Sequence, residues 1–70
     1  MDCFTRTKEL SRERGLSLKR LSELSNIPYQ TLMSAKKNGG RMSLDTVAYI
    51  CAGLGITLSE FFEDFDRYIM

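Results

Sequence analysis

Two short helix-like segments with a very tight break between them constrain this chain more than any other feature. Residues 21–37, LSELSNIPYQTLMSAKK, carry an apolar stripe of helical spacing on each side of SNIP. Asn26 tolerates the left-handed backbone conformation, and Pro28 fits the first turn of a new helix. Helices joined so closely must cross at a steep angle. We therefore predict a helix-turn-helix over about residues 17–37, with its second helix standing proud of the domain.

The rest of the chain has helical spacing too, without the alternation typical of strands. Gly15, NGG and GLG are typical helix ends, whereas Ser17, Ser43 and the pair Thr57 and Glu60 are typical helix starts. We predict an all-α, compact five-helix domain spanning residues 1–70. Its apolar stripes are Phe4, Thr7 and Leu10; Leu18, Leu21, Leu24 and Ser25; Leu44, Val47, Ala48 and Cys51; and, running to the C-terminus, Leu58, Phe61, Phe62, Phe65 and Ile69.

Size and composition narrow the class of protein. Seventy residues, 43% of them hydrophobic and 27% charged, can bury one small core. No apolar run approaches the roughly 18 residues of a membrane span, and the start MDCFTRTKEL lacks the layout of a signal peptide. Cys3 and Cys51 have the spacing of neither a zinc site nor a disulfide framework. We expect a cytoplasmic protein that holds no metal and no cofactor.

The net charge of +1 conceals an uneven distribution along the chain. Residues 1–41 hold nine Lys or Arg against four acids, a net +5, and residues 42–70 hold one Arg against five acids, a net −4. This asymmetry indicates that the first part meets a polyanion. Two solvated faces with drifting charge would be the simpler interpretation.

The second helix of the predicted pair has unusual outward residues. At 100° per residue, Pro28, Thr31, Leu32 and Ala35 share the inward side, and Tyr29, Gln30, Met33, Ser34 and Lys37 share the outward side. A protruding helix fits the major groove of DNA, where Gln and Ser can read base edges and Met and Tyr can cover thymine methyl groups. Alternatively, Tyr29 and Met33 pack against a neighbouring loop, and Gln30 and Ser34 are plain surface.

Basic residues flank the predicted pair on both sides. We expect Lys19 and Arg20 in its first helix, Lys36 and Lys37 at the end of its second helix, and Arg41 in the following loop to meet phosphates. The hydroxyl of Ser17 and the nearby backbone N–H groups could hold a further phosphate.

The segments RERGLSLKRLSELSNIPYQTL and SLDTVAYICAGLGITLSEFF resemble the phage repressor and Cro-like (Xre-type) helix-turn-helix regulators over about residues 4–63. The resemblance implies a lambda-repressor-like five-helix fold, binding to a palindromic operator as a two-fold homodimer, and transcriptional regulation, usually repression. The family's base-contacting positions fall on Tyr29, Gln30, Met33 and Ser34. Its phosphate-contacting positions fall on Ser17, Thr31, Lys37 and the loop around Arg41.

The sequence departs from the family pattern at three places. Thr7 replaces a large apolar residue, which should thin the core, and Leu18 replaces a Gln that touches phosphate in many relatives. KKNGG replaces the common Glu-x-Gly ending, with Lys36 in place of the acid. The added positive charge should strengthen backbone binding.

The C-terminal segment raises the question of partners. Phe61, Phe62, Phe65, Tyr68 and Ile69 offer more apolar surface than one short helix normally buries, so we expect a homodimer contact there. The same residues could instead pack within the monomer. A second hypothesis is an antitoxin or co-regulator that binds a protein partner through SEFFEDFDRYIM. An enzyme is not expected, because the chain has no His, no Gly-rich phosphate loop and no nucleophile–base spacing.

Overall fold

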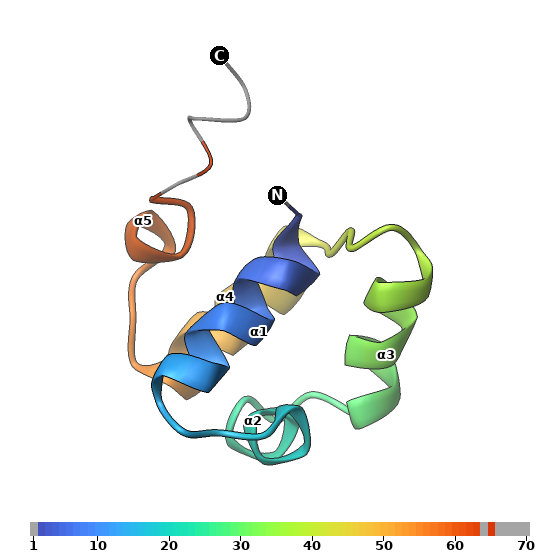
Figure 1. Cartoon of the computed structure of the whole chain (residues 1–70), viewed down its shortest axis with the longest axis horizontal. Helices are drawn as coiled ribbons and strands as arrows, with labels where there is room; N and C mark the ends of the chain where they lie inside the picture. The colour runs from blue at the N-terminus through green and yellow to red at the C-terminus, as the bar shows by residue number, and fades with distance from the viewer. Residues whose placement is uncertain (1, 64, 66–70) are drawn as a thin grey trace.

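The computed structural model describes residues 2–63 and residue 65, and this part of the chain contains helices and no strand. The helices are α1 (Cys3–Glu13), α2 (Leu18–Leu24), α3 (Tyr29–Lys37), α4 (Leu44–Leu54) and α5 (Leu58–Phe61). Helices α1 and α4 pack against each other, with α2 across one end of the pair and α3 and α5 on opposite sides of it (Figure 1). The predicted all-α fold of five helices is confirmed.

Most predicted helix starts are confirmed by their hydrogen bonds. The hydroxyl oxygens of Ser17 and Ser43 accept from the backbone N–H groups of Arg20 and Thr46. Thr57 and Glu60 form the reciprocal capping box. Pro28 lies one residue before α3 rather than inside its first turn. An unpredicted cap begins α1, where the carboxylate of Asp2 accepts from the Thr5 N–H at 2.7 Å.

The core lies where the helices meet. Its buried residues come from all five helices and from the turn after α2: Leu10, Leu21, Ile27, Leu32, Val47, Ile50, Cys51, Leu54 and Phe61. Thr7 is fully buried beside them, and its hydroxyl donates to the Cys3 carbonyl at 2.8 Å. The hydroxyl of Thr7, which stands where the family has a large apolar residue, therefore has its hydrogen-bond partner within α1.

Some predicted core residues are exposed, and the predictions for them are wrong. Leu44 is 64% exposed, Leu24 is 45% exposed and Leu58 is 41% exposed, and Ala48 is exposed as well. Val47 and Cys51 of the predicted stripe are buried, and Ile50 and Leu54 lie inward in place of Leu44 and Ala48. The periodicity of α4 suits either stripe, and packing against α1, α2 and α5 selects one of them.

The last helix is much shorter than predicted. Helix α5 ends at Phe61, and Phe62 and Glu63 form a turn, so the expected continuous helical stripe is wrong. Phe61 is fully buried, and its ring contacts the rings of Phe62 and Phe65. Tyr68 and Ile69 lie outside the described residues.

Candidate nucleic-acid interface

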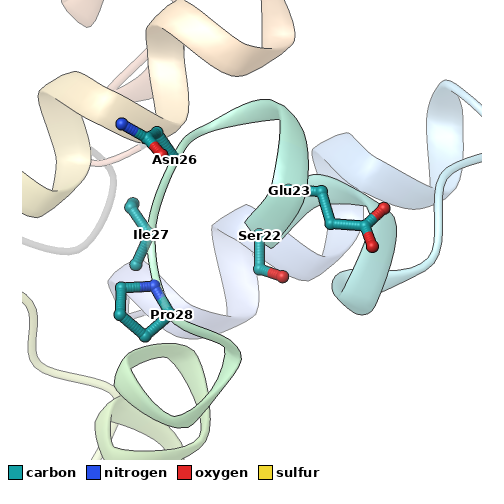
Figure 2. Close-up of a pocket in the computed structure, with 5 residues that line it drawn as sticks. All are labelled: Ser22, Glu23, Asn26, Ile27 and Pro28. Atoms are coloured by element: carbon teal, nitrogen blue, oxygen red, sulfur yellow. The ribbon is translucent and has the colours of Figure 1, made fainter.

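The turn between α2 and α3 is held by a specific pattern of backbone hydrogen bonds. Asn26 has φ of 57°, its N–H donates to the Glu23 carbonyl, and the Ile27 N–H donates to the Ser22 carbonyl. These bonds and the left-handed residue form a Schellman motif, which satisfies the last carbonyls of α2. Figure 2 shows Asn26, Ile27 and Pro28 following one another along the connection to α3.

The same turn fixes where α3 begins. Ile27 is buried in the core, so its side chain anchors the turn against the rest of the domain. Pro28 has φ of −58° and leads directly into α3 without a side-chain cap. Helix α3 is therefore placed by the turn before it and by its own buried residues, Leu32 and Ala35.

The outward face of α3 exposes most of the residues that the sequence assigned to base reading. Tyr29, Gln30 and Ser34 are exposed, as is Lys37. Met33 differs, because it is half-buried and packs against the core. Its long, flexible side chain lies against the apolar surface, so the predicted outward position of Met33 holds only in part.

Thr31 also differs from its predicted place. It is exposed rather than inward. It lines a hollow between α3 and the start of α4, named here the α3–α4 hollow. Ser34, Asn38, Arg41 and Ser43 line the same hollow. The structure thus brings Thr31 and Arg41, both expected at phosphates, beside Ser34, which was expected at bases.

Lys19 and Tyr29 connect the two helices of the motif. The Lys19 Nζ atom lies 5.3 Å from the centroid of the Tyr29 ring. A cation at this distance from an aromatic ring is attracted to it, by about 0.5–1 kcal/mol at an exposed site. The contact holds a basic side chain of α2 next to the first residue of α3.

The other cations expected at phosphates have different surroundings. The Arg20 guanidinium pairs with the Glu23 carboxylate at 3.2 Å, and both side chains are exposed. Lys36 lies on the other side of α3 from the α3–α4 hollow. It lines a second hollow there, together with Asp2 and Lys8 of the α1 region. Lys36 is therefore separate from the group formed by Thr31 and Arg41.

These features define a helix-turn-helix in which an exposed polar helix is flanked by basic residues. Comparison with protein families matches residues 7–66 to the Cro/C1-type HTH DNA-binding domain. The chain belongs to this family, and the predicted family resemblance is confirmed. Comparisons with curated proteins and with solved structures gave no match.

Family membership assigns a broad class of function, DNA binding by a domain typical of non-enzymatic regulators. Among the described residues, no helix is long and apolar enough to span a membrane. Residues 2–63 and 65, which the structure describes, contain no group of three or more acidic, cysteine or histidine side chains that could hold a metal ion.

Proposed function

We propose that this protein binds a specific sequence of double-stranded DNA by inserting α3 into the major groove, and that it regulates transcription, most simply as a repressor that occupies an operator. The observation that carries the proposal is the exposed row of Tyr29, Gln30 and Ser34 on a helix anchored by the buried side chain of Ile27 in the turn before it. A helix placed so firmly can present these side chains in one orientation.

Each side chain of the row has a partner chemistry at base edges. The Gln30 amide can donate to N7 and accept from N6 of adenine, and the Ser34 hydroxyl can donate or accept. The Tyr29 ring suits the methyl group of thymine. Met33 contributes only the part of its side chain that the core leaves accessible.

The phosphate contacts fall on both sides of this row. Ser17, Lys19 and Arg20 lie at the start of α2. Thr31 and Arg41 line the α3–α4 hollow, and Lys37 is the last residue of α3. Arg20 must exchange Glu23 for a phosphate, which costs little because both side chains are exposed. Basic residues at these positions set the register of the protein on the duplex, whereas the base contacts set the sequence.

The test is selection of random duplexes by the purified protein at about 150 mM salt, where charge interactions are screened beyond about 8 Å. Enrichment of a palindrome with half-sites about one helical turn apart is expected for a sequence-reading dimer. Enrichment of a single half-site would retain base reading and remove the DNA-bound dimer. No enrichment would contradict the proposal and favour the second candidate, an antitoxin or co-regulator that binds a protein partner.

We further propose a homodimer, in which Phe62 and Phe65 form part of the subunit contact; Tyr68 and Ile69, expected there as well, lie outside the described residues. Phe61, first expected there, is excluded because it is fully buried within the monomer. Phe62 and Phe65 remain half-buried, so part of each ring is available to a second chain. Sedimentation of the protein with and without operator DNA tests the dimer, and a single chain on a complete palindrome would contradict it.

The cysteines support the proposed cytoplasmic location. Cys3 and Cys51 are free thiols, as is usual in a reducing compartment. Cys51 is buried in the core and Cys3 is half-buried at the start of α1.

A further inference from the structure

Helix α1 carries exposed basic residues that the binding surface described above does not include. Lys8 and Arg12 are exposed one helical turn apart on α1. Both line a hollow between α1 and the start of α2, named here the α1–α2 hollow; its lining residues are Lys8, Ser11, Arg12, Gly15, Leu16, Ser17 and Leu18. Two cations and no carboxylate thus surround it.

The α1–α2 hollow adjoins residues already assigned to phosphate binding. Ser17 lines it, and the Ser17 hydroxyl oxygen accepts from the Arg20 N–H, which leaves the hydroxyl proton free to donate outward. Lys8 also lines the neighbouring hollow that contains Lys36. Basic residues therefore lie from the end of α3, across α1, to the start of α2, and the Asp2 carboxylate lies among them in the hollow of Lys36.

We infer that Lys8 and Arg12 bind a backbone phosphate of the DNA in the α1–α2 hollow. The inference rests on the proposed function, because the start of α2 approaches the duplex only when α3 occupies the groove. The residues that line the α1–α2 hollow come from α1 and the start of α2, whereas those that line the α3–α4 hollow come from α3, the following loop and the start of α4. Lys8 and Arg12 thereby add a phosphate contact to those made at the start of α2.

The acidic residues of α1 do not neutralise this pair. The Glu9 carboxylate faces Arg6, at 3.8 Å from its Nη1 atom. Glu13 is exposed, and neither acid lines the hollow. The local charge of the hollow is therefore positive.

The first experiment measures the affinity of Lys8→Gln and Arg12→Gln proteins for one duplex at salt concentrations from about 50 to 300 mM. Each substitution should lower the slope of log K against log salt by a little under one, with an equal loss of affinity on selected and random duplexes. Arg14→Gln is the matched control. Its guanidinium donates back to the Leu10 carbonyl at 3.2 Å and does not line the hollow, so its slope should change much less.

The outcomes separate this inference from the proposed function. A wild-type protein that does not bind duplex DNA would overturn both. Wild-type binding with unchanged slopes for Lys8→Gln and Arg12→Gln would overturn the inference alone. Arg14→Gln slopes as low as theirs would also overturn it, since the effect would then be one of net charge.

A second measurement locates the phosphate. Duplexes with a single uncharged methylphosphonate are scanned along one half-site with wild-type and Lys8→Gln proteins. At one position the two proteins should bind equally, because the charge that Lys8 contacts is absent there. An equal deficit of the Lys8→Gln protein at every position would overturn contact with a defined phosphate.

Discussion

The guanidinium group of Arg6 caps the last helix, since its Nε atom donates a 2.7 Å hydrogen bond to the Phe61 carbonyl. Its Nη2 atom donates to the Glu60 carbonyl at 2.8 Å. Arg6 is buried, and Phe61 is fully buried beside it. The first helix and the last are thus joined by a charged donor on two carbonyls at the end of α5, of which the Glu60 carbonyl also accepts from the Glu63 N–H at 3.4 Å.

Arg6→Met should lower the free energy of unfolding by about 2–3 kcal/mol. Hydrogen bonds to a charged group contribute about 1.5–3 kcal/mol, and the Phe61 and Glu60 carbonyls would lose this charged donor. Urea unfolding should show a lower midpoint with an unchanged slope. Arg14→Met, which removes only one bond at an exposed site, is the control. A loss below about 0.5 kcal/mol for Arg6→Met, within the range of ordinary surface substitutions, would contradict the capping role.

Gly53→Ala should destabilise the packing of α2 on α4. A Cβ atom at Gly53 would overlap the Ser25 hydroxyl, and overpacking of this kind costs about 1–3 kcal/mol. The Ser25 hydroxyl is buried with no hydrogen-bond partner in the described structure, so Ser25→Ala alone should be close to neutral.

The double variant provides the decisive measurement for this contact. Gly53→Ala with Ser25→Ala should recover part of the lost stability, because the overlapping atom is gone. Chemical unfolding of all four proteins gives the coupling energy. Additive effects would show that the two positions do not collide.

The two thiols should differ in their rate of alkylation. Burial raises the pKa of both the Cys3 and Cys51 thiols, and the thiolate is the reactive form. Cys51 is only 3% exposed, whereas Cys3 is half-buried at the start of α1. Iodoacetamide at pH 8 should therefore modify Cys3 first and Cys51 only through opening of the fold. Mass spectrometry of timed samples measures both rates, and equal rates in the native protein would contradict this order.

The raised pKa of Cys51 also makes the stability of the fold depend on pH. A group whose pKa is higher in the folded state stabilises the fold below its unfolded pKa and loses that contribution as the pH rises through the folded pKa. Stability should therefore fall above the ordinary cysteine value of 9.0. In a Cys51→Ala protein this part of the fall should be absent, and an unchanged fall would assign it to other groups.

Gln30→Ala and Lys37→Gln should weaken DNA binding in different ways. Loss of a bidentate base contact costs about 1–3 kcal/mol on the selected sequence and little on random DNA, so specificity falls. Loss of a phosphate contact weakens both duplexes alike and reduces the salt slope by a little under one. Affinity on both duplexes at several salt concentrations separates the two effects. An unchanged specificity ratio for Gln30→Ala would remove Gln30 from base reading.

Local sequence determined most of the helix starts of this protein and the ends of α1 and α2, although the end of α5 and the Asp2 cap were not predicted. Ser17, Ser43 and the Thr57–Glu60 pair cap helices because their side chains reach backbone N–H groups only three residues away. Asn26 and Gly15 end helices because their own backbone adopts positive φ. Interactions this short in range do not depend on the rest of the fold, so the sequence alone predicts them.

Only the tertiary structure decided which of two possible faces of α4 is buried. The periodicity of α4 allows either Leu44 or Ile50 to face inward, and contact with α1, α2 and α5 chose Ile50. Contacts between helices likewise place Met33 against the core and the Arg6 guanidinium at the end of α5. They also bring Lys8, Arg12 and Ser17 together around one hollow. Such contacts join residues far apart in the chain, and hydrophobic spacing within one helix carries no information about them.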